Sequence, residues 1–322
     1  MYDFIGDVHG QSERLEALLV LMGYSKHSGV YSHPQRKAFF IGDLIDRGPQ
    51  QVQTLEIVRL MVEGGHAEVV LGNHEYNGCA WATPDPESPG EYLRPHTEKN
   101  RHQHRAFLDQ VGEGSALHRE TVSWFKTLPV FVETPEFRAI HACWHGPFIE
   151  QSRQYLDANN VILPQSWVPM SRKDTEPYFI IENLLKGTEI ELPAGLTYFD
   201  PDGNERNRTR TRWWDETATT YRSAGMLKSS LLHQLPEASI PAKNLLTYDQ
   251  AKPLFIGHYW MTGRPSLLTP TVACLDYSIG KGTRGTKLCA YRWNGEQLLT
   301  SDAFVWVDAL ESHLAYTPSV AP

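Results

Sequence analysis

The sequence predicts an α/β protein with a sheet that is covered on both faces. Three short apolar segments, YDFI, KAFF and AEVV, are separated by two segments whose apolar residues recur at helical spacing. Strands that alternate with amphipathic helices are typical of this class. Each apolar segment is followed by glycine and a polar residue, at Gly6-Asp7, Gly42-Asp43 and Gly72-Asn73. Ligands bind beyond the carboxyl ends of strands in such sheets.

Residues 1–75 are expected to hold three strands and two helices. YDFIGD predicts the first strand, and SERLEALLVLMGY predicts a helix that Ser12 caps. The apolar positions of this helix are Leu15, Leu18, Leu19 and Met22. KAFFIGD predicts the second strand and QVQTLEIVRLMVEGG the second helix, with Pro49 near its start and glycines at its end, as is common at helix termini. AEVVLGNHE predicts the third strand.

The rest of the chain predicts a cap, an insertion and further strands, all within one domain of residues 1–322. Residues 76–134 are rich in proline, charge and histidine, which predicts loops and a helical cap. LPVFVETPEFRAIHACW predicts a hairpin with TPEF at its turn. Residues 146–252 are expected to form a substrate-side insertion with a helix in EPYFIIENLLKGTEIELP. Three more strands are expected in KPLFIGHYW, TVACLDYS and TKLCAYRWNGEQLL.

The composition is that of a globular protein. The chain has 322 residues, of which 41% are hydrophobic and 21% charged, so it can bury a large core. The net charge of −8 argues against a surface that binds nucleic acid throughout, although a local basic groove stays open. There is no apolar run of membrane-spanning length, no signal-peptide pattern and no C-x-x-C spacing. We therefore expect a cytoplasmic protein with reduced cysteines and no membrane partner; its oligomeric state stays open.

Side chains that bind metals or transfer protons follow the predicted strands. They are Asp7, His9, Asp43, Asp46, Arg47, Asn73, His74, His141 and His258. GDVHG alone would indicate only a turn, because glycine and aspartate are common turn residues. Carboxylate and amide oxygens together with imidazoles, however, suit divalent transition metals.

Two ions fit these residues if one carboxylate is shared. The first ion could bind Asp7, His9 and Asp43. The second could bind Asp43, Asn73, His141 and His258, so that Asp43 bridges both ions. Two metal ions about 3.5–4 Å apart stabilise the attacking and leaving oxygens of a displacement at phosphorus.

The motifs GDVHG, GDLIDRG and GNHE, in this order and each after a strand, resemble the signature of the calcineurin-like metallophosphoesterase superfamily. They look most like the branch that contains the serine/threonine phosphoprotein phosphatases and the symmetrical diadenosine tetraphosphatases. The resemblance is strong over residues 1–75 and returns near His141 and over residues 257–290. It implies a β-sandwich of two mixed sheets flanked by helices, with the cap and the insertion added to it.

The resemblance also implies a role for each motif residue. The metal ligands would be those named above, around two divalent ions; Mn²⁺ is expected, and Fe or Zn satisfy the same ligands. His74 would be the general acid that protonates the leaving oxygen, and Asp46 would orient it. Arg47 would hold a phosphate oxygen with its planar guanidinium. Asp276 matches an aspartate that some relatives hold just outside the metal ligands, with a buried structural aspartate as the equal alternative.

Several assignments stay open at the level of the sequence. His145 competes with His141, which is preferred because it directly follows the apolar segment FRAI. The second phosphate-binding arginine of the protein phosphatases has candidates that are mostly expected to form a solvated basic face: Arg206, Arg208, Arg210 and Arg212. Three cap histidines lack carboxylate or cysteine companions and are not expected to bind metal: His96, His102 and His104.

The combined features predict a metal-dependent phosphoric ester hydrolase in which a hydroxide that bridges the two ions attacks phosphorus. A covalent route lacks support, because no G-x-S-x-G motif is present. The phosphorylated substrate is expected to be a protein or a broad range of monoesters, with a bis(5'-nucleosyl)-tetraphosphate as the second choice. Phosphorylated nucleic-acid ends come third, from the arginines beside tryptophans in RNRTRTRWW. The non-enzyme alternative is a catalytically silent binding scaffold, which would lack a metal ligand or His74.

Overall fold

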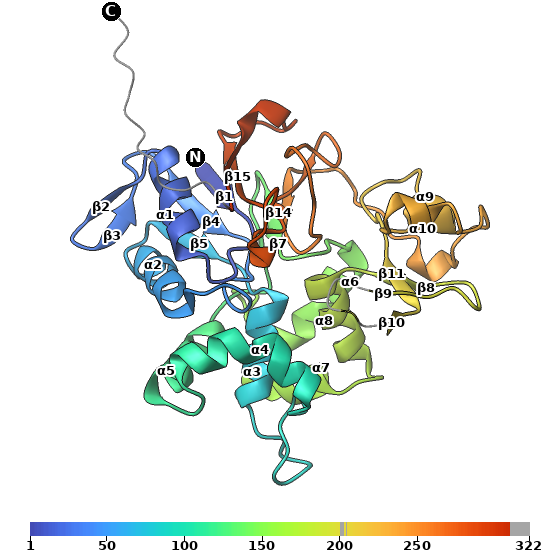
Figure 1. The fold of residues 1–322 in the computed structure, drawn as a ribbon, viewed down its shortest axis with the longest axis horizontal. Coiled ribbons are helices and arrows are strands. Elements are labelled where there is room, and N and C mark those ends of the chain that lie inside the picture. The colour runs from blue at the N-terminus through green and yellow to red at the C-terminus, as the bar shows by residue number, and fades with distance from the viewer. Residues whose placement is uncertain (200–202, 204, 310–322) are drawn as a thin grey trace, which may run out of the picture.

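Two β-sheets packed face to face form the centre of the protein (Figure 1). The computed structural model describes residues 1–199, 203 and 205–309. The six-stranded sheet has the order β14-β15-β1-β4-β5, and β16 pairs with β15. Its strands are β1 (Tyr2–Ile5), β4 (Lys37–Phe40), β5 (Ala67–Val69), β14 (Asp276–Tyr277), β15 (Lys287–Trp293) and β16 (Phe304–Asp308).

The second sheet has four strands in the order β13-β12-β7-β6. They are β6 (Phe131–Glu133), β7 (Arg138–Ile140), β12 (Leu254–Ile256) and β13 (Val272–Cys274). β6 and β7 form the hairpin predicted around TPEF, and Thr134 closes its turn on Phe137. The predicted β-sandwich with two mixed sheets is confirmed.

One predicted strand, TVACLDYS, is divided between the two sheets. Its first part is β13 in the four-stranded sheet, and its second part is β14 in the six-stranded sheet. The chain crosses between the sheets at Leu275, whose carbonyl oxygen lies 2.1 Å from the position that a Cβ on Gly6 would take. Only glycine can occupy position 6, because the two backbones approach so closely there.

Aromatic side chains fill the space between the sheets. Phe4 of β1 stacks on Phe255 of β12, with ring centroids 3.6 Å apart. Phe137 and Trp293 meet these rings edge-on, and all four side chains are buried. Burial of large aromatic rings is a major source of stability in sandwiches, so this cluster fixes the two sheets against each other.

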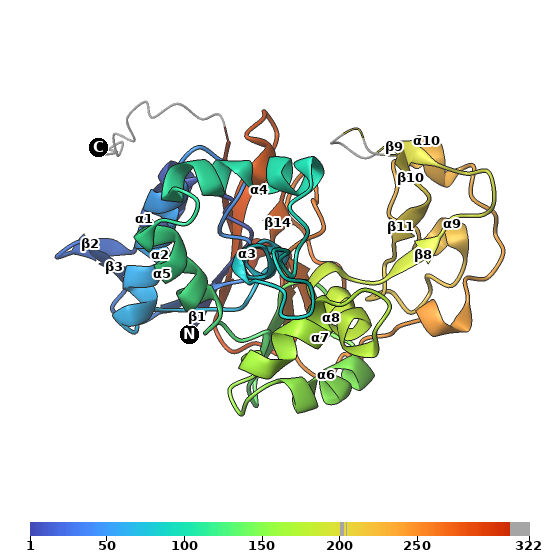
Figure 2. The same cartoon turned by 90° about the horizontal axis from the view of Figure 1, so that it is seen from below.

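Helices cover the outer face of the six-stranded sheet and surround the carboxyl ends of its strands (Figures 1 and 2). The helices are α1 (Ser12–Leu21), α2 (Gln51–Glu63), α3 (Asn73–Ala82), α4 (Glu98–Val111), α5 (Ala116–Phe125), α6 (Gly146–Ser152), α7 (Trp167–Ser171) and α8 (Glu176–Lys186). The expected cap by Ser12 was wrong, because Ser12 is the first helical residue and Gln11 stands at the N-cap without a side-chain bond. The side chain of Gln50 instead accepts a hydrogen bond from the backbone N–H of Glu13.

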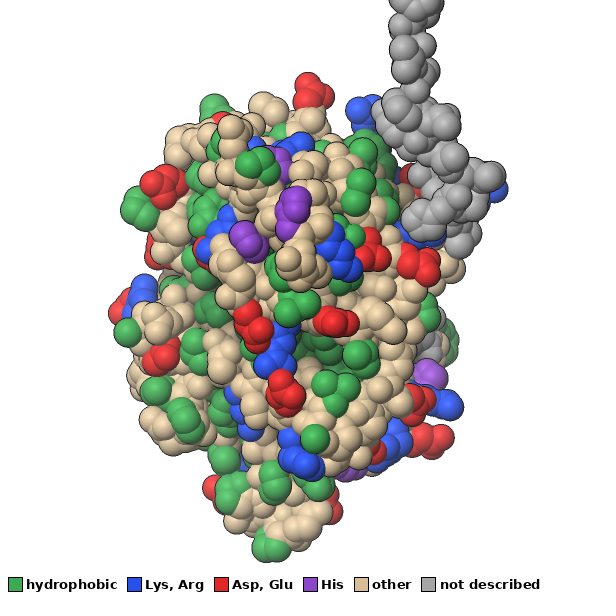
Figure 3. All heavy atoms as spheres, turned by 90° about the vertical axis from the view of Figure 1, so that its left-hand side faces the viewer, with side chains coloured by type: hydrophobic (Ala, Val, Ile, Leu, Met, Phe, Trp, Pro, Cys, Tyr) green, Lys and Arg blue, Asp and Glu red, His purple; other side chains and the backbone are tan. Residues whose placement is uncertain are grey.

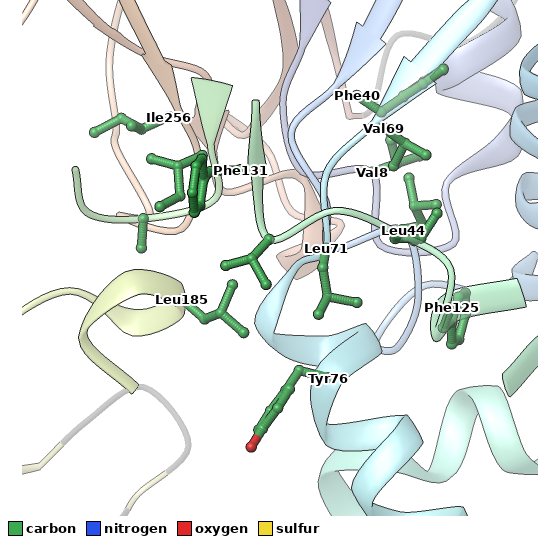
Figure 4. Close-up of a cluster of buried hydrophobic side chains, with 14 of the residues drawn as sticks. Val8, Phe40, Leu44, Val69, Leu71, Tyr76, Phe125, Phe131, Leu185 and Ile256 are labelled. Atoms are coloured by element: carbon green, nitrogen blue, oxygen red, sulfur yellow. The ribbon is translucent and has the colours of Figure 1, made fainter. Parts of the chain in front are cut away.

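The cap and insertion helices share one apolar cluster with the second sheet (Figure 4). Figure 4 labels Leu185 of α8 and Tyr76 of α3 among the side chains of this cluster, together with Phe131 and Leu71. Each of these four side chains is less than 4% exposed. The limits proposed for the cap, 76–134, and the insertion, 146–252, stay predictions, as does the single domain.

Part of the insertion forms a small lobe that stands away from the sandwich, at the right of Figures 1 and 2. It contains β8 (Glu189–Glu191), β9 (Tyr198–Phe199), β10 (Glu205–Arg206), β11 (Arg208–Arg210), α9 (Tyr221–Ala224) and α10 (Ser229–Leu232). Its own small core includes Ile190, Ala224 and Ile240. The sequence did not predict this lobe, nor β16, nor the hairpin of β2 (Ser25–His27) and β3 (Val30–Ser32).

Short 3-10 turns connect several of these elements: Arg153–Tyr155, Pro164–Ser166, Ala242–Asn244, Ile279–Lys281 and Ser301–Ala303.

The face that carries α2 and α5 mixes acidic, basic and hydrophobic side chains, and charges of one sign do not dominate it (Figure 3). All four cysteines are buried and unpaired, as expected: Cys79, Cys143, Cys274 and Cys289.

A buried ion pair lies where the neighbouring strands β1 and β15 of the larger sheet meet. Arg36 Nε lies 2.8 Å from Oδ1 of Asp3, and the side chains are 7% and 0% exposed. The same guanidinium donates to the backbone carbonyls of Tyr2 and Trp293, at 2.7 and 2.9 Å. Arg36 therefore fixes β1 to β15, because one guanidinium bonds to the side chain of Asp3 and to backbone carbonyls of both strands.

Replacing Arg36 by alanine should destabilise the protein strongly. We expect Arg36→Ala to lower the free energy of unfolding by about 3–5 kcal/mol, because it leaves the carboxylate of Asp3 buried without its main partner. Urea denaturation followed by circular dichroism measures this change. Arg105→Ala is the control, because the Arg105–Asp109 pair is exposed and such pairs contribute about 0–1 kcal/mol. Equal stability of the two variants would contradict the role of Arg36.

Candidate metal centre and active site

The carboxyl ends of strands from both sheets meet at one place. β1, β4 and β5 are parallel, and they lead into Asp7, Asp43 and Asn73. β7 and β12 of the other sheet are parallel too, and they lead into His141 and His258. The backbone N–H of His258 lies 3.2 Å from Oδ2 of Asp7, which joins the two edges directly.

Asp43 lies at the centre of the site. Its Oδ2 is 3.3 Å from Nε2 of His141 and 3.8 Å from Nε2 of both His9 and His74. Its Oδ1 accepts a hydrogen bond from the backbone N–H of His74 at 2.9 Å. The residue is only 2% exposed. One carboxylate thus faces three imidazole nitrogens, which is the position that a bridging ligand requires.

Two sets of side chains have ligand atoms close enough to hold an ion. The sets are His9, Asp43 and His74, and Asp43, His141 and His258, with ligand atoms within 4.8 Å of one another. Asn73 Oδ1 adjoins the second set, 3.2 Å from Nε2 of His141. Asp7 belongs to neither set, and His74 takes its place in the first. The predicted ligand role of Asp7 therefore stays a prediction.

The orientation of the imidazoles fits a metal site. The Nδ1 atoms of His9 and His141 lie 2.8 and 2.6 Å from the carbonyl oxygens of Ile45 and Ile41. A ring that donates through Nδ1 to a carbonyl presents the lone pair of Nε2 to a metal. Nε2 of His9 and Nε2 of His258 are buried and have no hydrogen-bond partner among the described residues. A buried nitrogen without a partner is costly, and a bound cation would satisfy it.

Burial and neighbouring charges shift the pKa values of Asp7 and Asp43 in opposite directions. Burial raises the pKa of Asp7 well above its usual range, and the carboxylate of Asp276 raises it further. Burial alone would also raise the pKa of Asp43, but the imidazoles of His141 and His74 hold this pKa well below the usual range of an aspartate. Bound cations would relieve the repulsion between the clustered carboxylates.

Two of the imidazoles are held neutral. Burial and the neighbouring His74 lower the pKa of His9 to about 3. Burial and the guanidinium of Arg210 lower the pKa of His258 well below its ordinary value. Neutral imidazole is the form that binds metals, so these shifts favour a ligand role for both residues.

His74 forms a hydrogen-bonded pair with Asp46, as a general acid and its partner would. Nδ1 of His74 lies 2.6 Å from Oδ2 of Asp46. Burial alone would lower the pKa of His74, but the carboxylates of Asp43 and Asp46 outweigh it and raise the pKa. Asp46 has a second histidine neighbour: Nδ1 of His104, on α4, lies 2.8 Å from Oδ1 of Asp46. The sequence analysis missed this contact; its only signal was that His104 shares a helical face with Phe107, Leu108 and Val111, which are also buried.

Glu75, the last residue of GNHE, holds the loop that carries Asp43. Its Oε2 accepts the backbone N–H groups of Asp43 and Gly72, and its Oε1 those of Leu44 and Ile45. Glu75 is fully buried, and it is the third residue of α3. The sequence analysis gave it no role, although glutamate three residues after a helix start is a signal for capping.

The backbone of the site is strained at five predicted functional positions. The φ angles of His9, Asp43, Asp46, Arg47 and His258 are positive, between 48° and 70°. Residues other than glycine rarely adopt this conformation, and such residues gather at functional sites where the surrounding structure enforces it.

Two arginines lie beside the centre. The guanidinium of Arg47 is 4.3 Å from the ring of Trp260, and Gly280 leaves room for its side chain. Nη1 of Arg210 donates to the carbonyl of His258 at 3.0 Å. Of the four arginines considered from the sequence, Arg210 thus reaches the site, whereas Arg208 pairs with Glu191.

His145 and Asp276, whose roles the sequence left open, have different surroundings in the structure. The ring of His145 packs 4.4 Å from that of Phe148, whereas His141 faces Asp43. Asp276 accepts the backbone N–H groups of Trp260 and Ser278, at 2.7 and 2.8 Å. It therefore fixes the turn that follows His258.

The chain is similar in sequence to known proteins. The model of the calcineurin-like phosphoesterase family matches residues 2–219. The chain is 48% identical over 73 residues to the asymmetrical bis(5'-nucleosyl)-tetraphosphatase PrpE of Geobacillus sp. strain WCH70, and 42% identical over 73 residues to that of Oceanobacillus iheyensis. These matches cover 22% of the chain and only 30% and 29% of the relatives' own lengths.

Solved structures with a related outline have low sequence identity. A cold-active protein-tyrosine phosphatase of a psychrophilic Shewanella is 15% identical, with a TM-score of 0.49 and coverage of 96% of this chain and 80% of the other. A protein serine/threonine phosphatase from Saccharomyces cerevisiae is 12% identical, with a TM-score of 0.41 and coverage of 95% and 78%. In the part of the chain that the structure describes, no helix has the length and apolar character needed to cross a bilayer.

Replacing Glu75 by glutamine should loosen the loop that holds Asp43. The amide group would turn N–H donors toward backbone N–H groups, so we expect Glu75→Gln to lower the free energy of unfolding by about 2–4 kcal/mol. Chemical denaturation measures it. Glu13→Gln is the matched control, because Glu13 is exposed and its side chain accepts a hydrogen bond from Gln50 at the surface. If both variants are equally stable, Glu75 does not support the loop.

Proposed function

Because the chain belongs to the calcineurin-like phosphoesterase family, we propose that it hydrolyses phosphoric esters with two divalent cations bound at the site described above. The observation that carries the proposal is the buried carboxylate of Asp43 with three imidazole nitrogens within 3.8 Å of it. A catalytically silent scaffold would lack a metal ligand or the acid. Every residue type that the metal site and the acid require is present, so this alternative has no support.

The ligand set proposed from the sequence is retained. Asp7, His9 and Asp43 would hold one cation, and Asp43, Asn73, His141 and His258 the other. Mn²⁺ is the proposed metal, because the mixed oxygen and nitrogen ligands suit it. Bound divalent cations lower the pKa of water to supply a nucleophile, and they neutralise charge on the phosphoryl oxygens.

The protein's own side chains would position the ester and deliver the proton. Arg47 and Arg210 would hold phosphoryl oxygens, since guanidinium groups match phosphate geometry. Nε2 of His74 would donate a proton to the leaving oxygen, while Nδ1 donates to Asp46 and keeps the ring in place.

The proposed substrates are phosphate monoesters, with phosphoproteins first. A bis(5'-nucleosyl)-tetraphosphate is the second candidate, and the likeness to the PrpE enzymes favours it, although that likeness covers only 22–23% of this chain. Nucleic-acid ends lose support, because Trp213 and Trp214 are 2% and 4% exposed and cannot stack on bases. The four unpaired cysteines agree with a cytoplasmic location, where thiols stay reduced.

The first test is metal-dependent hydrolysis. We expect the purified protein to hydrolyse p-nitrophenyl phosphate with Mn²⁺ and to lose this activity with a chelator. Parallel assays with phosphopeptides, diadenosine tetraphosphate and end-phosphorylated DNA distinguish the substrate candidates. No hydrolysis of any of these by protein with fully loaded metal would overturn the proposal.

Replacing the shared carboxylate should weaken both metal sites. We expect the wild-type protein to bind two Mn²⁺ ions in titration calorimetry, and Asp43→Asn to weaken both binding events, since it removes the charge between them. Asp109→Asn, on the exposed end of α4, is the control and should bind two ions. Two tightly bound ions in Asp43→Asn would refute the bridging assignment.

Replacing the proposed acid should slow the reaction selectively. We expect His74→Asn to reduce kcat by about 10²–10⁴-fold for alkyl phosphates, the usual scale for one acid–base group. The loss should shrink for aryl phosphates with good leaving groups, which need no proton, and metal content should stay near that of the wild type. A loss of one bound ion would instead make His74 a ligand, as its proximity to His9 and Asp43 allows.

A further inference from the structure

His104 is a buried histidine of α4 that the proposed chemistry does not use. It is 3% exposed, and its Nδ1 lies 2.8 Å from Oδ1 and 3.1 Å from Oδ2 of Asp46. We propose that His104 is a positioning residue: it holds the carboxylate of Asp46 in the plane in which Asp46 orients His74. The inference rests on the proposed function, because it assigns the leaving-group proton to His74.

The geometry around Asp46 supports this role. His74 and His104 reach the carboxylate from different helices, and their closest contacts are to different oxygens. The backbone N–H of Asp46 also donates to Oε1 of Gln51, at 2.7 Å. A carboxylate held by one donor can rotate about its terminal bond, whereas donors on both oxygens fix its plane.

The second ring nitrogen of His104, Nε2, indicates that the side chain does more than fill space in the core. Nε2 is buried without a hydrogen-bond partner among the described residues, which is unfavourable. The ring packs near Phe107 and Trp81, with centroids at 4.9 and 6.2 Å. Phenylalanine would fill such surroundings without an unsatisfied nitrogen. The bond from Nδ1 to Asp46 is therefore what distinguishes histidine at this position.

Room for the ring is provided by the helix that carries His74. A Cβ on Gly78 of α3 would lie 3.1 Å from Cε1 and 3.3 Å from Nε2 of His104. Both distances are shorter than ordinary contacts, so any larger residue at position 78 would push the ring. Helices α3 and α4 thus meet at the His104 ring, and α4 of the cap acts on the acid through Asp46.

The test compares two substitutions of His104 with a matched control. His104→Phe keeps a ring but removes the donor, whereas His104→Asn keeps an N–H near the position of Nδ1. The control is His118→Phe. His118 is another buried histidine whose ring packs on Phe107, with centroids 5.7 Å apart, but its Nδ1 accepts the backbone N–H of Gly114 instead of contacting Asp46. Each variant is assayed with alkyl phosphates and with aryl phosphates of graded leaving-group pKa.

We expect His104→Phe to lower kcat for alkyl phosphates by about ten- to a hundredfold, the scale for residues that orient a functional group. The loss should diminish as the leaving group improves, with KM and metal content unchanged. His104→Asn should recover most of the activity, and His118→Phe should show no leaving-group dependence. Gly78→Ala should shift kcat in the same direction as His104→Phe. Equal losses on all substrates, or no recovery in His104→Asn, would overturn the proposal.

A readout without catalysis separates this inference from the proposed function. In metal-free protein, the hydrogen-bonded Nδ1–H proton of His74 should give a downfield NMR resonance that is absent in His74→Asn. We expect the resonance to broaden or disappear in His104→Phe and to persist in His104→Asn and His118→Phe. Its persistence in His104→Phe would refute the positioning role, whether or not the protein hydrolyses phosphoric esters.

Discussion

The burial of one charged carboxylate, Asp43, is the constraint on which the rest of the site depends. An ionised carboxylate at 2% exposure is costly unless charges and hydrogen bonds surround it. The structure supplies a backbone N–H from His74 and the Nε2 atoms of three imidazoles. Those imidazoles come from three separate segments, so the charge of Asp43 is satisfied only when both sheets are assembled. Formation of the site and packing of the sandwich are therefore one event.

The loops that deliver these side chains are held by other buried groups. Glu75 accepts four backbone N–H groups, three of them from the loop after β4, and Asp276 accepts those of Trp260, after β12, and Ser278, after β14. One of these bonds is made by Asp43 itself, whose left-handed backbone conformation a residue with a Cβ adopts only at an energetic cost. Two buried carboxylates thus support the loops that carry the candidate site.

The residues of the candidate site come from every large segment of the chain. The N-terminal α/β units provide Asp7, Asp43 and His74, and the second sheet provides His141 and His258. The insertion places Arg210 against the carbonyl of His258. The helices of the cap and the insertion share one apolar cluster with the strands, so the segments that supply these residues pack on a common core (Figure 4).

Local patterns in the sequence were sufficient for the central strands, the main helices and the residues of the three motifs. Apolar periodicity and turn residues act over a few positions, so β1, β4, β5 and the polar residues after them could be predicted. β16 pairs with the preceding strand β15, and its apolar sequence FVWVD is a local signal that the sequence analysis did not use. The division of one predicted strand at Leu275, in contrast, depends on pairing with two different sheets, which no local pattern encodes. The same reason explains why the contact of His104 with Asp46, the loop held by Glu75 and the approach of Arg210 emerged only in three dimensions. A hydrogen bond between residues 58 positions apart is decided by how helices pack; the sequence around His104 indicates only that it lies on the apolar face of a helix.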